Sequence, residues 1–186
     1  MNTETKRPAK NTEENIEAAI DMLFPSVWDW LQSAGDSQYE NEEREGVRKD
    51  LKKAITSCVG DYDGYKIAKN LDDWCMWECD AQLVDILDSF WHFSDRVHHE
   101  AVKQWVQEQS INPQHSIGDN ITVKVLDKEY TGVVVGLNPV SATYTVNISE
   151  LGHKKFSIDA HGGVVFEPGS GSLGVIVGVE EIDGKG

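Results

Sequence analysis

The chain has 186 residues, with 17 Lys and Arg against 32 Asp and Glu, which gives a formal net charge of −15 at neutral pH. This acidity argues against a general nucleic-acid binder, which needs basic side chains to neutralise phosphates, and against binding to anionic membranes. No apolar run reaches the roughly 18 residues of a membrane-spanning helix, and the polar N-terminus carries no secretory signal, so we expect a cytoplasmic protein.

The composition changes near residues 110–113. All six tryptophans and all three cysteines precede this point, whereas glycine is concentrated after it. Residues 1–112 carry 12 basic and 23 acidic side chains, and residues 113–186 carry 5 and 9. Pro113 disfavours continuation of a helix. We therefore expect an α+β protein with a disordered tail over 1–10, an acidic multi-helix bundle over 11–112, a small antiparallel β-barrel over 113–182 and a second tail over 183–186.

The first part is predicted to contain about four to six packed helices. Asn11 followed by Glu14 resembles a capping box, and it opens a helix that Pro25 is expected to end, with a second short helix starting at Ser26. A third helix is predicted over 38–59 from the helical spacing of its apolar residues. Those residues are Val47, Leu51, Ala54, Ile55, Cys58 and Val59. Similar spacing predicts helices near 65–75, 83–90 and 97–105.

The second part alternates between apolar and polar residues with period two, which is typical of strands. Val133, Val135 and Leu137 are expected to share the buried face of one strand. Five or six short strands must close on themselves or cover their edges, so a small barrel is expected. The predicted strands lie near residues 121–125, 133–137, 144–148, 156–158, 164–166 and 175–179.

Three stretches, 117–123, 130–136 and 142–146, read Ile-Gly-Asp-Asn-Ile-Thr-Val, Tyr-Thr-Gly-Val-Val-Val-Gly and Ala-Thr-Tyr-Thr-Val. Together they resemble small Src-homology-3-like barrels of the KOW/Tudor kind, over residues 115–167. The resemblance implies a barrel that binds RNA, DNA, a peptide or a protein face. KOW modules that bind nucleic acid are usually basic, whereas this stretch offers few bases. The bases are Lys124, Lys128, Lys154 and Lys155.

The two-part layout of the chain also resembles small proteins of bacteriophages and other mobile elements.

Four residues of zinc-binding types follow the spacing Cys-x3-Cys-x12-His-x5-His: Cys75, Cys79, His92 and His98. Thiolates and imidazoles suit a tetrahedral zinc ion. The intervening segment reads as helix rather than as the hairpin of a zinc finger, and the two cysteines lie among apolar residues where free cysteine commonly packs. Core cysteines are therefore the preferred interpretation, and a zinc-stabilised protein remains an alternative.

Catalytic motifs are incomplete in this chain. After the run His98-His99-Glu100, Lys103 stands where a metalloprotease helix needs its second histidine. Lys66 replaces the glycine that a calcium loop beginning at Asp61 requires. The 132–136 stretch lacks the Lys-Ser/Thr of a phosphate loop, and 169–174 does not follow the nucleophile-elbow pattern. We therefore expect no catalysis and no cofactor.

The most unusual segment is 70–95, which contains seven acids and no Lys or Arg. Several of these acids are seven residues apart, a rise of about 10.5 Å if one helix continues, so their carboxylates would line one side of it. A second acidic group lies nearby at 40–45, close to a basic group at 48–53. The acids expected to contact a partner are Asp72, Asp73, Glu78, Asp80, Asp85 and Asp88.

Crowded carboxylates repel one another in the folded chain, and a basic partner would relieve that repulsion. We therefore expect a non-catalytic inhibitor from a phage or mobile element that mimics nucleic acid and blocks the basic channel of a host defence protein. Trp74 or Trp77, if exposed, would anchor the contact. One alternative is a solvated helix face that only promotes solubility. Another is an accessory module whose barrel binds a peptide, a protein face or nucleic acid.

Overall fold

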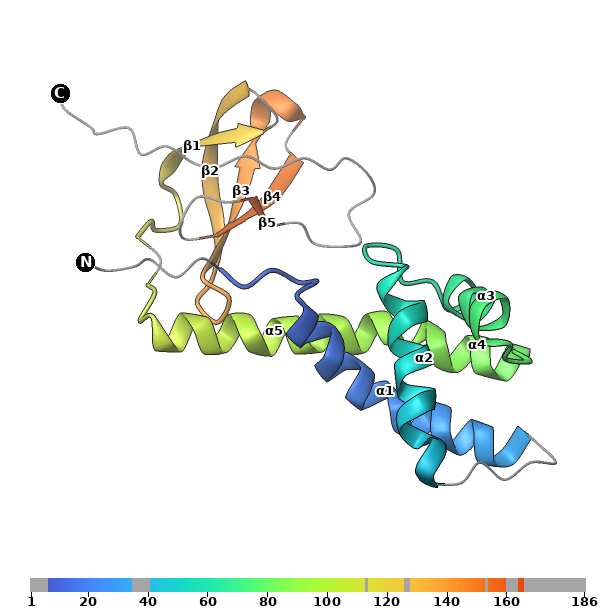
Figure 1. The fold of residues 1–186 in the computed structure, drawn as a ribbon. Helices are drawn as coiled ribbons and strands as arrows, with labels where there is room; N and C mark the ends of the chain where they lie inside the picture. The colour runs from blue at the N-terminus through green and yellow to red at the C-terminus, as the bar shows by residue number, and fades with distance from the viewer. Residues whose placement is uncertain are drawn as a thin grey trace. The chain divides into compact units, whose positions relative to one another are not determined.

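The computed structural model describes residues 7–34, 41–112, 114–125, 128–152, 154–159 and 164–165 (Figure 1). In these residues helices precede an antiparallel sheet, which confirms the predicted α+β class. The chain divides into a helical unit, up to Ala101, and a β unit, from Val102. The helices are α1 (Glu13–Ala34), η1 (Asn41–Glu43), α2 (Arg44–Thr56), α3 (Gly64–Cys75), α4 (Ala81–Asp88) and α5 (Phe90–Glu108). The remaining elements are β1 (Asn120–Val125), β2 (Lys128–Asn138), β3 (Thr143–Ile148), η2 (Ser149–Leu151), β4 (Lys154–Asp159) and β5 (Val164–Val165).

Helix α1 runs through Pro25, so the prediction that this proline ends the helix was wrong. The two short helices expected on either side of Pro25 form one helix. Proline removes one backbone hydrogen bond and costs about 3 kcal/mol inside a helix. Side chains that follow the proline offset this cost, since each contributes about 1.5–3 kcal/mol on full burial. They are Val27, Trp28, Trp30 and Leu31.

The start of α1 also differs from the expectation by one residue. The Oγ1 of Thr12 accepts the backbone N–H of Asn15 at 3.2 Å, so Thr12 rather than Asn11 caps the helix. Pro8 and Lys10, which were predicted to belong to a disordered tail, contact α5. The ammonium of Lys10 contacts the carboxylate of Asp95 at 2.7 Å.

The remaining helices follow the predicted spacing closely. In α2 the expected stripe is buried, although the exposed Val59 lies beyond the end of the helix. Residues 38–40 of the predicted helix lie outside the described residues. Side chains from α1 to α5 share one core, so the apolar spacing of the first part is explained by packing. Its largest fully buried side chains are Ile20, Leu23, Val27, Leu51, Ile55, Ile67, Leu71, Leu83, Leu87 and Phe90.

Helices α3 and α4 approach each other closely at Gly64. A Cβ atom on this glycine would lie 2.4 Å from the carbonyl oxygen of Val84 and 2.6 Å from the backbone nitrogen of Asp88. The backbone N–H of Gly64 donates to Oδ1 of Asp88 at 3.1 Å. Glycine is therefore required at the first position of α3, because any side chain would push α4 away.

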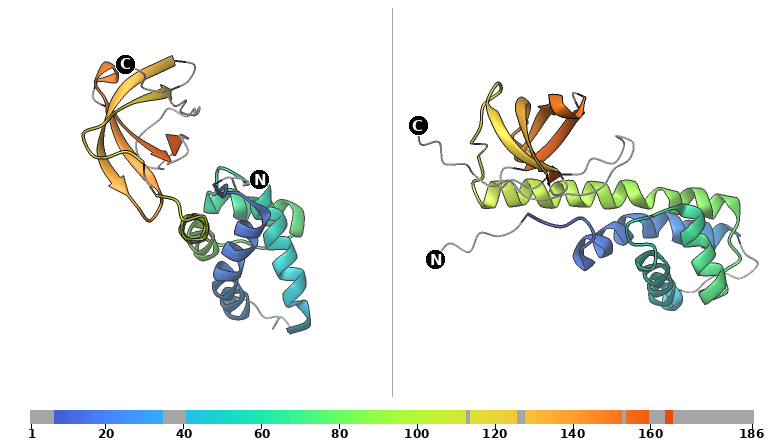
Figure 2. Two further views of the ribbon diagram at one scale, coloured as in Figure 1. Left: turned by 90° about the vertical axis from the view of Figure 1, so that its left-hand side faces the viewer. Right: turned by 90° about the horizontal axis from the view of Figure 1, so that it is seen from above.

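The described strands form one antiparallel sheet in the order β1-β2-β3-β4-β5, and Figure 2 shows that it is strongly curved. A register shift between Val134 and Gly136 marks a bulge in β2. At the positions of β1 and β3 whose burial is described, the buried side chains of the sheet confirm the predicted alternation. Its buried side chains are Ile121, Val123, Val134, Tyr144, Val146 and Ile148.

The buried face of β2 is one residue out of phase with the prediction. Val134 is fully buried, whereas Val133, Val135 and Leu137 are about 40% exposed on the other face. The reason lies in Gly132, where a Cβ would stand 2.4 Å from Cγ1 of Val146. Only glycine fits on the inner face at that position, and this fixes the phase of the whole strand.

Among the described residues, β1 pairs with β2 alone and β5 with β4 alone, so these strands form an open meander rather than a closed barrel. The strand predicted near 175–179 lies outside the described residues, as do Pro113 and the tail predicted at 183–186.

The last turns of α5 belong to the β unit. Ala142, in the turn between β2 and β3, is fully buried in a small cluster with Val102, Trp105 and Val106 of α5. The hydroxyl of Tyr144 in β3 accepts the backbone N–H of His115 at 3.2 Å. These contacts connect the sheet with the end of α5 and with the segment that follows it.

Candidate functional site

The predicted acidic surface lies on three consecutive segments rather than on one helix. Helix α3 ends at Cys75 and α4 begins at Ala81, so acids seven residues apart across this break do not line a single helical side. The condition for that alignment, one helix continuing through the segment, is therefore not met, in agreement with the separate helices predicted near 65–75 and 83–90. All six predicted carboxylates are nevertheless exposed: Asp72 and Asp73 in α3, Glu78 and Asp80 in the connection, and Asp85 and Asp88 in α4.

Two of the six acids hold the fold together. Oδ1 of Asp80 accepts the backbone N–H of Leu83 at 2.8 Å, which caps α4, and it also accepts the indole N–H of Trp30 at 3.1 Å. Asp88 accepts the N–H of Gly64, as described above. Side-chain oxygens in such positions stabilise helix N-termini by about 1 kcal/mol. The carboxylates of Asp80 and Asp88 therefore already accept hydrogen bonds within the fold and are less available to a partner.

The other four acids have no such role. Within the described ranges, the carboxylates of Asp72, Asp73, Glu78 and Asp85 form neither a hydrogen bond nor an ion pair with any described group. They lie in and around the last turn of α3, the connection and α4. These four exposed residues are here called the acidic surface, and their negative charge is not offset by any described ion pair.

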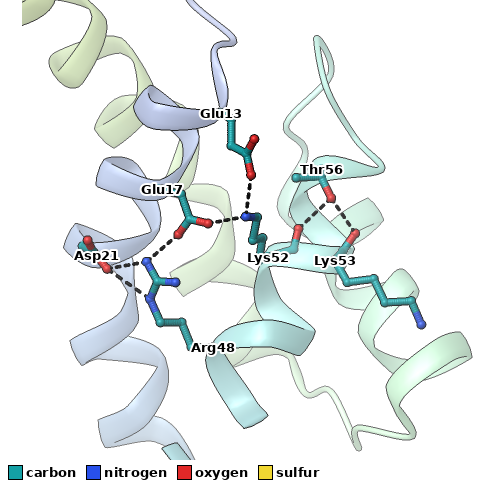
Figure 3. A network of polar contacts seen from close by, with 7 residues as sticks. All are labelled: Glu13, Glu17, Asp21, Arg48, Lys52, Lys53 and Thr56. Carbon is teal, nitrogen blue, oxygen red and sulfur yellow. Dashed lines mark hydrogen bonds and ion pairs between the residues drawn. The ribbon is translucent and has the colours of Figure 1, made fainter. Parts of the chain in front are cut away.

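Two bases of α2, Arg48 and Lys52, face α1, whereas a third, Lys53, lies near Trp74 of α3. Figure 3 shows Arg48 and Lys52 among three acids of α1. Nη2 of Arg48 lies 2.5 Å from Glu17 and 2.7 Å from Asp21, while Nζ of Lys52 contacts Glu17 and lies 2.9 Å from Glu13. The hydrogen bond from Lys52 is the main reason that the pKa of Glu17 lies below its usual value, and Arg48 adds to it. These two bases are thus neutralised by α1.

An apolar group accompanies the acidic surface. Trp74 is 47% exposed, and Met76 is 90% exposed. The Nζ of Lys53 lies 5.7 Å from the ring centroid of Trp74, in range of a cation–π contact. Trp74 thus meets the condition set for an anchor. Nothing in the sequence marks Met76 as exposed, because its exposure follows from its position at the end of α3.

Trp77, the other predicted anchor, is half-buried. Its ring stacks on Trp30 with centroids 6.5 Å apart, and its indole N–H donates to Asp50 at 3.4 Å. Trp77 packs against the helical core, so it stabilises the fold and does not offer an exposed ring to a partner.

The two cysteines of the zinc alternative are packing residues in this structure. Sγ of Cys79 donates to the carbonyl of Ala68 at 3.4 Å, and both cysteines pack against the helical core. Burial raises the pKa of the Cys79 thiol to about 11 and also raises that of Cys75. A raised pKa disfavours the thiolate that binds zinc.

The two histidines make contacts of their own. The His92 ring lies against Trp91, with centroids 3.6 Å apart, and Nε2 of His98 lies 3.2 Å from the carbonyl oxygen of Pro8. Burial lowers the pKa of His98. In the part of the chain that is described, no three His, Cys, Asp or Glu side chains are grouped so that they could hold a metal ion.

The comparisons with known proteins give no further guidance. No family model, no curated protein and no solved structure matches this chain. Of the helices in the described ranges, none combines the length and apolarity that crossing a bilayer requires.

Proposed function

We propose that this protein is a non-catalytic cytoplasmic inhibitor that covers a basic nucleic-acid-binding surface of another protein, as a phage or mobile-element protein would against a host defence protein. The observation that carries this proposal is the group of four exposed carboxylates without described partners, at Asp72, Asp73, Glu78 and Asp85. Their charges stand where a partner would otherwise meet phosphates.

Bases close to the acidic surface would offset its negative charge. Arg48 and Lys52 are engaged by α1, so they do not offset the charge of α3 and α4. Exposed charges attract a basic partner over about 10 Å at 0.1 M salt, the screening length. Such attraction raises the association rate, and it weakens as salt is added.

The proposal is tested with a matched pair of triple variants. The first neutralises Asp72, Asp73 and Asp85 as Asn, and the control neutralises Glu14, Glu129 and Glu150 as Gln. Both sets are exposed, and both variants change the net charge equally. Poly-L-lysine of fixed length serves as the basic probe, with affinity measured at several salt concentrations.

We expect the Asn variant to bind roughly tenfold more weakly than the Gln variant and to show a shallower salt dependence. Equal weakening by the two variants would mean that only net charge matters, and it would contradict a localised binding surface. Variants at Asp80 and Asp88 are unsuitable because those carboxylates also hold helices in place.

A second candidate function lies in the β unit. The five described strands form an open antiparallel meander in sequential order, and the sequence of this region resembles an SH3-like barrel. We propose in this case a module that binds a peptide, a protein face or nucleic acid through the outer face of β2. The specific support is the exposure of Val133, Val135 and Leu137. Replacing Val135 and Leu137 with Ser should then abolish partner binding, whereas the Asn variant of the acidic surface should retain it.

A further inference from the structure

Met76 has a backbone conformation and an environment that folding does not explain. Its φ is +58°, in the left-handed region that favours glycine, and its side chain is 90% exposed. Met76 donates its N–H to the carbonyl of Asp72, and its left-handed conformation ends α3. Glycine would end the helix in this way without steric cost. The methionine side chain contributes almost no burial, so the choice of this residue calls for another cause.

The charge of the last turn of α3 also destabilises this helix in the isolated chain. Asp72 and Asp73 lie near the C-terminal end of this helix, where the helix dipole is negative, and the last turn contains no basic residue. Trp74 lies between these acids and Met76 with nearly half of its surface exposed. Local conflicts of this kind are expected where a surface serves binding.

We propose that Trp74 and Met76 form an apolar anchor that selects, among basic partners, a segment in which apolar side chains lie among lysines and arginines. This inference rests on the proposed function, because it names the partner chemistry of the same surface. Charge complementarity supports it: Asp72, Asp73 and Glu78 surround the anchor in sequence and are exposed. The partner's cations would face these acids, and its apolar side chains would cover Met76.

The ring of Trp74 adds a second element of recognition. In the free chain the ammonium of Lys53 lies 5.7 Å from the centroid of this ring, so the ring already attracts a cation. An arginine of the partner would displace Lys53 from that face, since guanidinium groups stack readily on indole rings. Thioether side chains such as that of Met76 adapt to partners of different shape.

The test uses two synthetic peptides of about 18 residues with equal numbers of lysines. In one peptide leucines recur at helical spacing, and in the other serines replace the leucines. Affinity for the full chain is measured by calorimetry for the natural protein, for Met76→Gly and for Tyr65→Ala. The last variant is a control, because Tyr65 is an exposed apolar residue in the first turn of α3.

We expect the natural chain and Tyr65→Ala to bind the leucine peptide roughly tenfold more tightly than the serine peptide. Met76→Gly should lose most of this preference while its unfolding midpoint in urea stays equal or rises. If both peptides bind equally well to the natural chain, with steep salt dependence, the anchor is wrong and the acidic surface stands. If neither peptide binds, both the anchor and the proposed function are contradicted.

Discussion

The carboxylate of Asp88 in α4 accepts the backbone N–H of Gly64 at the start of α3, at 3.1 Å. The same glycine leaves no room for a side chain, because a Cβ would stand within 3 Å of three backbone atoms of α4. The hydrogen bond and the close approach together set the position of α3 against α4. Since the acidic surface extends over both helices, its geometry depends on this pair.

Gly64→Ala should therefore destabilise the helical unit by about 2–4 kcal/mol, because the backbone of α4 cannot yield without moving the core. Urea unfolding followed by far-UV circular dichroism measures the effect. Gly46→Ala is the matched control: no atom lies within 4 Å of its Cβ position in α2, so it should be neutral or stabilise by up to about 1 kcal/mol. A loss of the same size in both variants would refute the close approach.

Asp80→Ala should cost about 1–2 kcal/mol, because it removes the cap of α4 and the acceptor of the Trp30 indole N–H. Asp85→Ala, in the exposed part of the same helix, should change the free energy of unfolding by less than about 0.5 kcal/mol. Chemical denaturation of both variants checks the difference. Similar costs would mean that the cap contributes little.

Met76→Gly should stabilise the helical unit by up to about 1 kcal/mol, since it removes a Cβ from the left-handed region. The opposite change is available at Gly60, whose φ is +89° and whose surroundings are open. Gly60→Ala should cost about 1 kcal/mol for the same steric reason. Thermal unfolding of both proteins tests the pair, and a loss of stability in Met76→Gly would show that its side chain does support the fold.

The network between α1 and α2 predicts a loss of stability in acid. The pKa of Glu17 is lowered in the folded chain, chiefly by its hydrogen bond from Lys52. Its contribution is therefore complete above the ordinary value of 4.5 and is lost as the pH falls from there through the lowered folded-state pKa. Glu17→Gln should flatten the fall in unfolding free energy across this range.

The control for this effect is Glu14→Gln, an exposed residue of the same helix. It should leave the pH dependence of unfolding unchanged. If Glu14→Gln and Glu17→Gln flatten the curve equally, the pairing with Lys52 and Arg48 does not determine the acid sensitivity.

The sequence predicts the helices best where apolar residues recur over several turns. The stripe of α2 is an example, since Val47, Leu51 and Ile55 can be buried together only in a helix. The prediction that Pro25 ends the first helix was wrong because the burial that offsets its local cost occurs in residues that follow it. In β2 the run Val133–Val135 contains no polar residue, so its phase could not be read without the packing of Gly132.

The acidic surface was predicted in composition but not in shape. Its charges are visible in the sequence, and so is the end of α3, since the apolar spacing predicts a helix near 65–75. The left-handed conformation of Met76 carries no such signal, because this residue is not a glycine. For the same reason the structural roles of Asp80 and Asp88 became visible only with their partners Trp30 and Gly64.

Helix α5 serves two cores in succession. Phe90 belongs to the helical core, while Val102, Trp105 and Val106 pack under the turn that holds Ala142. A protein shortened after Glu108 would thus retain the helical core, yet the apolar side chains at the end of α5 would lose the turn that covers them. Uncovered apolar side chains promote self-association, so dissecting the two halves requires that these three side chains be made polar first.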